Sequence, residues 1–245
     1  MKRNRLDYYM QISGMCESRN IAQNLIKNEK VLLNDKVCKI PSTLVDSNDK
    51  ISLIENEKYV SRGAYKLIAA LKEFEVEVAN KICLDIGSST GGFTQVLLEN
   101  KAKKIFSLDV GKDQLHKKLR NISNIIVLEK INFKDVDNQT FNNEKINVIT
   151  CDVSFISARK ILEKINSLLW KDFEFILLFK PQFEVGKQEI SKHQGLVKNQ
   201  SLKEKILNDF IDYSNLLGFK VIKTIISPIK GAKLKNEEFL IYLRK

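Results

Sequence analysis

Residues 84–93 read Leu-Asp-Ile-Gly-Ser-Ser-Thr-Gly-Gly-Phe, where an apolar run passes through a glycine-rich loop into a helix-like segment. Glycines at such a strand-to-helix turn let the backbone approach a ligand and deliver it to the helix N-terminus. The spacing of Gly87, Gly91 and Gly92 is not the Gly-x-Gly-x-x-Gly of dinucleotide folds, which disfavours a pyrophosphate ligand. The acidic Asp85 would also repel a phosphate and attract a cation.

Apolar runs of four to eight residues, rich in β-branched and aromatic side chains, recur around this loop, and helical patterns separate several of them. Such alternation predicts a mostly parallel sheet covered on both faces, a doubly wound α/β fold. Two last runs leave no room for a helix between them and should pair antiparallel at the sheet edge. Seven strands with such an end resemble the methyltransferase form of this fold. The predicted strands are 82–86, 105–110, 125–128, 146–153, 173–179, 221–227 and 239–243, and the predicted helices are 94–98, 156–169 and 202–217.

Asp109 ends the apolar run that follows the glycine loop. An acid at this place commonly accepts hydrogen bonds from both hydroxyls of a ribose. The two acids and the loop therefore predict a site for S-adenosyl-L-methionine, whose sulfonium and amino acid tail suit an acidic field. The alternative is a plain strand-to-helix turn that a carboxylate caps. The cofactor residues predicted in this way are Asp85, Gly87, Ser89, Thr90, Gly91, Gly92, Phe93 and Asp109.

Two further polar residues stand where apolar strands end, at the edge of the sheet where sites in such folds lie. Asp152 belongs to the end of the run 146–153, and Lys180 follows the run 173–179. A lysine is costly to bury unless it is paired. We expect the two side chains to face one crevice, although a lysine that merely extends into solvent is the alternative.

Residues 1–56 have a different pattern, with short helix-like and short alternating stretches. Ser18 suits the N-cap of a helix, and Asn34-Asp35 between two apolar runs predicts a hairpin. We predict a small α+β domain at 1–56, a linker at 57–62 and the large domain at 63–245.

The composition indicates which kinds of partner the protein can have. Forty-one Lys and Arg against thirty Asp and Glu give a net charge of +11, which favours a polyanion such as nucleic acid, although a lysine-rich composition alone would explain it. Two histidines and four scattered cysteines make a metal site unexpected, and free thiols indicate a reducing compartment, the cytoplasm. No apolar run approaches the roughly 20 residues of a membrane span.

The order and spacing of several short motifs resemble the TlyA family, whose members are named haemolysins but are related to FtsJ-type ribosomal RNA ribose methyltransferases. Arg5-Leu6-Asp7 and Ser18-Arg19 resemble the small RNA-binding domain that this family shares with pseudouridine synthases. Besides the glycine loop, the large domain carries Tyr-Val-Ser-Arg-Gly at 59–63, Asp-Val-Gly at 109–111, Asp-Val-Ser-Phe-Ile-Ser at 152–157, Lys-Pro-Gln-Phe-Glu at 180–184 and Ser-Pro-Ile-Lys-Gly at 227–231.

The resemblance implies a catalytic tetrad of Lys66, Asp152, Lys180 and Glu238. Lys180 would orient or deprotonate a ribose 2′-hydroxyl, while the other three would tune its charge and hold the ribose. Glu237 is the alternative to Glu238, since adjacent strand residues face opposite sides and only one can face the site. The resemblance also implies Asn132 near the adenine of the cofactor. A tyrosine, Tyr65, replaces the usual residue before Lys66 and is expected to alter the cleft floor.

For RNA contacts we predict six cations, namely Arg3, Arg5, Arg19, Arg62, Lys230 and Lys233. Phe155 and Phe183 stand beside the catalytic candidates and could stack on a nucleotide drawn out of its helix, although core aromatics are the alternative.

The resemblance thus implies an S-adenosylmethionine-dependent 2′-O-methyltransferase of cytidine in ribosomal RNA. Longer members act on the RNA of both subunits and shorter ones on the large subunit. Because the small domain begins almost at the first residue, 23S RNA is favoured, with 16S RNA as the alternative. The alternative hypothesis is a ribosome assembly factor that binds the cofactor without catalysis. A membrane haemolysin would need an amphipathic or spanning segment, and the sequence shows neither.

Overall fold

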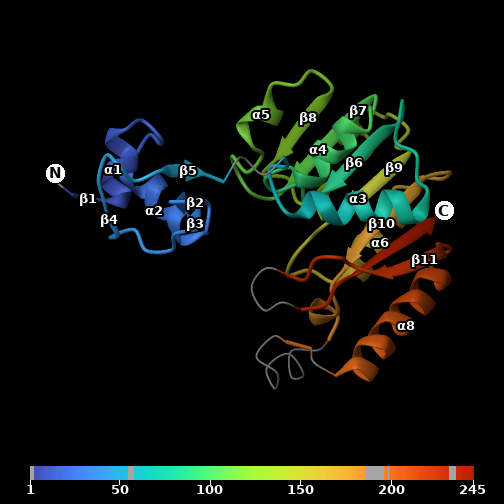
Figure 1. Ribbon diagram of the computed structural model, residues 1–245. Helices are drawn as coiled ribbons and strands as arrows, with labels where there is room; N and C mark the ends of the chain where they lie inside the picture. The colour runs from blue at the N-terminus through green and yellow to red at the C-terminus, as the bar shows by residue number, and fades with distance from the viewer. Residues whose placement is uncertain (1–2, 55–57, 186–195, 198, 232–235) are drawn as a thin grey trace. The chain divides into compact units, whose positions relative to one another are not determined.

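The computed structural model describes residues 3–54, 58–185, 196–197, 199–231 and 236–245 (Figure 1). The chain divides into two compact units, Met1–Lys58 and Tyr59–Lys245. Each unit has hydrophobic core residues of its own. The narrower limits expected from the sequence, 1–56 and 63–245, stay a prediction.

The described residues of the small unit form two helices and several short strands. Its elements are β1 (Asn4–Arg5), α1 (Leu6–Ile12), α2 (Arg19–Lys27), β2 (Val31–Leu33), β3 (Lys36–Val37), β4 (Leu44–Val45) and β5 (Ile51–Leu53). Ser18 caps α2 by accepting a hydrogen bond from the backbone N–H of Ile21, as predicted. The predicted hairpin joins β2 and β3, and Asn34 and Asp35 both have positive φ, as a two-residue hairpin turn of type I′ requires.

The large unit is built on a seven-stranded sheet in the order β11-β12-β10-β9-β6-β7-β8. Its strands are β6 (Ile82–Ile86), β7 (Lys104–Asp109), β8 (Ile125–Glu129), β9 (Val148–Cys151), β10 (Glu174–Phe179), β11 (Lys220–Ile226) and β12 (Phe239–Arg244). β12 runs antiparallel to both β10 and β11, and the other paired strands are parallel. The predicted seven-stranded, mostly parallel methyltransferase sheet is confirmed. β9 is shorter than the predicted 146–153 because its pairing with β6 and β10 begins at Val148 and ends at Cys151.

Helices cover both faces of this sheet (Figure 1). They are α3 (Gly63–Phe74), α4 (Gly92–Glu99), α5 (Lys117–Arg120), α6 (Ala158–Ser167) and α8 (Gln200–Leu216), with 3₁₀ turns η1 (Phe133–Asp135), η2 (Gln139–Phe141) and η3 (Pro181–Phe183). Successive strand residues face opposite sides. Cys83 accordingly packs in the core with α3 and α4, and Leu84 packs in the core with α6 and α8. The sequence patterns did not predict α3.

Candidate active site

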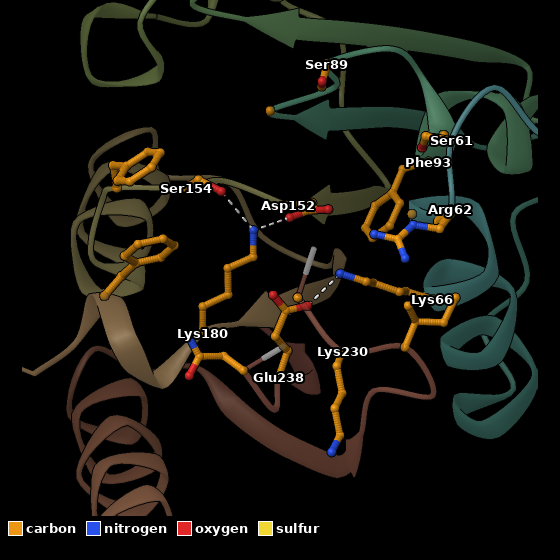
Figure 2. Close-up of a pocket in the computed structure, with 18 of the residues that line it drawn as sticks. Ser61, Arg62, Lys66, Ser89, Phe93, Asp152, Ser154, Lys180, Lys230 and Glu238 are labelled. Atoms are coloured by element: carbon orange, nitrogen blue, oxygen red, sulfur yellow. Dashed lines mark hydrogen bonds and ion pairs between the residues drawn. The ribbon is translucent and has the colours of Figure 1, made fainter. Parts of the chain in front are cut away.

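A cavity of about 860 Å³ lies at the carboxyl ends of the parallel strands of the large unit (Figure 2). Segments that follow β6, β9 and β10 line it, together with the start of α3 and the chain before β12. This is where ligands bind in open α/β sheets. The lining residues are Ser61, Arg62, Gly63, Lys66, Gly87, Ser88, Ser89, Thr90, Gly92, Phe93, Asp152, Ser154, Phe155, Lys180, Gln182, Phe183, Val185, Ile229, Lys230, Gly231, Asn236 and Glu238.

The glycine-rich loop forms one wall of the cavity. Gly87 has φ +78°, and a Cβ there would lie 2.8 Å from the carbonyl oxygen of Asp152. Gly91 has φ +96°, and a Cβ there would lie 2.5 Å from a methyl carbon of Leu119. The positive φ favours glycine at both positions, and at Gly87 the main chain of Asp152 also leaves no room for a side chain.

Asp109 fixes the shape of this loop. Its Oδ2 accepts the backbone N–H of Ser89 at 2.9 Å, and its Oδ1 accepts that of Gly111 at 2.7 Å. Each carboxylate oxygen retains a second lone pair for a ligand. Asp109 is half-buried and does not itself line the cavity.

Asp85 is fully buried and does not line the cavity. It accepts hydrogen bonds from the hydroxyls of Thr94 at 2.6 Å and Thr150 at 3.0 Å. Burial raises the pKa of Asp85 to about 7, and the nearby negative charge of Asp152 adds to the rise. The structure thus places this predicted cofactor residue beneath the loop, where it ties β6 to β9 and α4.

Of the other predicted cofactor residues, some line the cavity and some do not. Gly87, Ser89, Thr90, Gly92 and Phe93 line the cavity. Gly91 and Asn132 do not line it. Asn132 caps η1, because its side-chain oxygen accepts the backbone N–H of Lys134 at 3.1 Å.

Lys180 and Asp152 form an ion pair in the cavity wall. Lys180 Nζ lies 2.5 Å from Asp152 Oδ1, 3.0 Å from the carbonyl oxygen of Val153 and 3.1 Å from Ser154 Oγ (Figure 2). The Lys180 side chain is only 9% exposed. The expectation that the two strand-end residues face one crevice therefore holds, and the alternative of a solvent-directed lysine is wrong.

Lys66 and Glu238 form a second ion pair in the same cavity. Lys66 Nζ, in the first turn of α3, lies 2.5 Å from Glu238 Oε2, and both side chains are buried. Glu237 instead pairs with Lys203 at 3.0 Å and does not line the cavity. Of the two adjacent glutamates, Glu238 is therefore the one that faces the cavity.

Two phenylalanines meet at the cavity. The ring centroids of Phe155 and Phe183 lie 5.3 Å apart. Phe155 is 84% exposed and has φ +65°, so the alternative of a core aromatic is wrong for this residue. Tyr65 packs edge-on against Tyr59 and does not line the cavity, which corrects the expectation that it alters the floor.

The predicted RNA-contact cations fall into two groups. Arg62 and Lys230 are exposed residues of the cavity lining. The arginines of the small unit are held in ion pairs: Arg5 and Arg19 reach the buried Asp7 at 3.0 and 3.1 Å, and Arg3 reaches Asp46 at 3.5 Å. Lys233 lies outside the described residues.

The sequence reasoning missed Ser61, Ser154 and Glu184. Ser61 packs against the glycine loop, where a Cβ on Gly92 would clash with its hydroxyl. Glu184 accepts hydrogen bonds from the Ser157 hydroxyl at 2.7 Å and from the backbone N–H of Ala158 at 2.6 Å, and burial raises its pKa. Glu184 thereby caps α6 and joins the segments that bear Lys180 and Asp152. All three lie within the quoted motifs, but only contacts between distant segments give them a role.

Within the described ranges, no three His, Cys, Asp or Glu side chains are grouped so that they could hold a metal ion. No helix in the described part of the chain is long and apolar enough to cross a membrane.

Comparison with known proteins identifies both units. The FtsJ-like methyltransferase model matches residues 59–245, and the S4 domain model matches residues 4–51. The chain belongs to the FtsJ-like methyltransferase family. The predicted resemblance to TlyA proteins, which combine these two domains, is confirmed by the relatives that follow.

Two curated relatives and one solved structure show the extent of the similarity. "Hemolysin A" of Brachyspira hyodysenteriae is 45% identical over 97% of this chain and 98% of its own length. The "23S rRNA (cytidine-2'-O)-methyltransferase TlyA" of Campylobacter jejuni is 43% identical over 93% of this chain and 94% of its own. A solved structure from Streptococcus thermophilus, described as a hemolysin, has a TM-score of 0.77 and 35% identity over 100% of this chain and 89% of that one.

Proposed function

We propose that this chain is an S-adenosyl-L-methionine-dependent 2′-O-methyltransferase that acts on cytidine in ribosomal RNA, with 23S RNA favoured. The observation that carries the proposal is the pair of lysine–carboxylate contacts, Lys180–Asp152 and Lys66–Glu238, in one cavity beside the glycine loop. The Campylobacter jejuni relative bears the name of this activity. Mapping of the product will decide between 23S and 16S RNA.

The residues of the glycine wall suit the proposed cofactor. The Asp109 carboxylate, which holds the loop, keeps lone pairs that can accept from ribose hydroxyls. The loop itself presents glycines and short side chains to the cavity. No lysine or arginine stands in the loop to favour a phosphate. When bound, S-adenosylmethionine supplies an electrophilic methyl group.

Lys180 is the residue proposed to act on the acceptor. A ribose hydroxyl is a weak acid, so its oxygen needs a neighbour that hydrogen-bonds it or takes its proton as the new bond forms. The Lys180 amine is held at the cavity by Asp152, and the pair of Lys66 and Glu238 lines the same cavity. Alignment of acceptor and methyl group supplies the rest, and no covalent intermediate is needed.

The remaining lining suits a single nucleotide presented away from its helix. Phe155 offers an exposed ring on which a base could stack, next to Phe183. Arg62 and Lys230 are exposed cations that could contact RNA phosphates. We propose that the S4-type unit adds further RNA contacts and that the protein works on ribosomal RNA or subunits in the cytoplasm.

The test is transfer of tritiated methyl groups from S-adenosylmethionine to ribosomal subunits that lack the modification, with the product mapped for 2′-O-methylcytidine. Wild type, Lys180→Ala and Lys203→Ala are run in parallel. Lys203 is a matched control, because it is also a buried lysine paired with a glutamate but lies outside the cavity lining.

We expect transfer by the wild type and by Lys203→Ala and a loss of at least 100-fold in Lys180→Ala. Transfer that survives Lys180→Ala would leave the activity and overturn the role of this lysine. Binding of the cofactor without any transfer would favour the assembly-factor alternative. Leakage of liposomes caused by the pure protein would favour the haemolysin alternative.

A further inference from the structure

The Lys180 amine has no hydrogen-bonding capacity left for a substrate. A lysine ammonium has three N–H donors and no acceptor. The structure directs them at Asp152 Oδ1, the Val153 carbonyl oxygen and Ser154 Oγ, at 2.5, 3.0 and 3.1 Å. A ribose O2′ that accepts a hydrogen bond from Lys180 must therefore replace one of these three acceptors.

The same count holds if Lys180 is neutral. The amine then has two N–H donors and one lone pair, and the lone pair is what accepts the proton of the ribose hydroxyl. The two N–H groups then serve two of the three partners, and the Ser154 hydroxyl can still satisfy the lone pair by donating to it. In either protonation state, one of the three present partners has to leave when the substrate arrives.

Two of the three acceptors are fixed. The Asp152 carboxylate forms an ion pair with Lys180, and the main chain of Asp152 is held on both sides: its N–H donates to the Ile86 carbonyl oxygen at 3.0 Å, and its own carbonyl oxygen packs against Gly87. The Val153 oxygen belongs to the main chain, so it moves only if the backbone moves.

The third acceptor can move. Ser154 is exposed, and rotation about one side-chain bond takes its neutral hydroxyl away from Lys180. Figure 2 shows Ser154 and Asp152 approaching the Lys180 amine from the wall of the cavity. Loss of a contact with a neutral hydroxyl also costs less than loss of the ion pair with Asp152.

We propose that the Ser154 hydroxyl occupies the hydrogen-bonding position on Lys180 that the substrate 2′-hydroxyl takes later. Ser154 is displaced when the nucleotide binds. This inference rests on the proposed function. Ser154 is thus a positioning residue, which keeps the amine directed at the cavity until the ribose takes over the contact.

The test is a binding cycle with two proteins and two substrates. Wild type and Ser154→Ala are titrated with unmethylated and with methylated ribosomal subunits, in excess S-adenosylhomocysteine. The methylated O2′ cannot donate a proton to a neutral amine, and its methyl group crowds the approach of a charged one, so we expect Ser154 to stay in place. Ser154→Thr retains the hydroxyl and serves as the conservative variant.

We expect Ser154→Ala to bind unmethylated subunits about two- to tenfold more tightly than wild type, because no side-chain hydroxyl has to be displaced. The affinity for methylated subunits should stay the same, and Ser154→Thr should follow wild type with both. Similar thermal midpoints of the three proteins would show that folding is intact.

Three results would overturn the proposal. An equal shift for both kinds of subunit would mean a merely structural role. No shift for either would mean that the hydroxyl is not displaced. A fall in kcat of more than tenfold in Ser154→Ala, restored by Ser154→Thr, would mean that the hydroxyl acts in the transition state. Methyl transfer by the wild type is measured first, and its absence would overturn the proposed function together with this inference.

Discussion

Asp85 and Asp152 stand near the carboxyl ends of the neighbouring strands β6 and β9, yet they lie in opposite surroundings. Asp152 lines the cavity and pairs with a lysine at 2.5 Å. Asp85 is fully buried and accepts hydrogen bonds from the hydroxyls of Thr94 and Thr150 and from the backbone of Thr94. Burial without a cation raises the pKa of Asp85 to about 7.

The comparison shows which of the two carboxylates can take part in the reaction and which one only stabilises the fold. A carboxylate that faces a cavity with a cation can serve the reaction, whereas a carboxylate sealed between two strands and a helix can only hold them together. Asp152 rests on the glycine loop that Asp85 supports, since the Asp152 carbonyl oxygen lies against Gly87. Asp85 therefore contributes to the shape of the cavity without being part of its lining.

Substitution of Asp152 by Asn should have the largest effect on catalysis. The amide still accepts a hydrogen bond from Lys180 but no longer neutralises its charge. We expect methyl transfer to fall by about 100-fold or more, with cofactor binding unchanged. Single-turnover transfer and calorimetric binding of S-adenosylmethionine measure the two quantities. Transfer within threefold of wild type would show that the charge of Asp152 is dispensable.

The second lysine–carboxylate pair should matter less, because Glu238 pairs with Lys66 and not with the lysine proposed to act on the acceptor. We expect Glu238→Gln to lower transfer by about tenfold, since it removes the charge of a hydrogen-bonded partner. Glu237→Gln is the control, because its carboxylate pairs with Lys203 outside the cavity lining. A larger loss in Glu237→Gln than in Glu238→Gln would reverse the assignment of the two glutamates.

The sequence predicted the sheet well, because apolar runs and the glycine loop are local signals. The same signals located Asp152 and Lys180, which follow buried strands. They did not separate Asp85 from Asp109, since both stand at strand ends and only the packing of Thr94 and Thr150 shows which one is sealed.

Contacts between distant segments explain most of what the sequence left open. Ser154 acquires a role only when β10 brings Lys180 to within 3.1 Å of it. The exposure of Phe155 follows from a positive φ that no sequence pattern signals. The choice between Glu237 and Glu238 required the position of Lys203, which lies on α8.

The structural role of Asp85 can be tested by the pH dependence of the free energy of unfolding in Asp85→Asn. A folded pKa of about 7 lies above the ordinary value of 3.8, so the charged form is penalised in the folded state. The penalty is absent below about pH 4, grows as the pH rises and is complete above 7. Relative to wild type, the variant should therefore gain stability between pH 5 and pH 8, by no more than about 4 kcal/mol.

Urea unfolding followed by Trp170 fluorescence measures this gain, because the single tryptophan lies in the large unit and packs against Phe141. Thr94→Val is a useful companion, since it removes a hydrogen bond from Asp85 while leaving its charge. A difference between Asp85→Asn and wild type that does not change with pH would mean that the pKa of Asp85 is the same in the folded and the unfolded chain, so that burial does not penalise its charged form.

Asp7 of the small unit offers a comparison with Asp85, because both carboxylates are buried but only Asp7 is paired with arginines. It is buried like Asp85 but accepts hydrogen bonds from Arg5, and this guanidinium holds the pKa of Asp7 well below its usual range. Its contribution to stability is therefore present above the ordinary pKa and lost as the pH falls through the folded value. Asp7→Asn should destabilise the small unit by about 2 kcal/mol at pH 7 and by less in acid. Hydrogen exchange of α1 and α2 measures this, with Asp35→Asn as control because its ion pair with Lys50 is exposed. An equal loss in the two variants would show that burial adds nothing to the Asp7 contact.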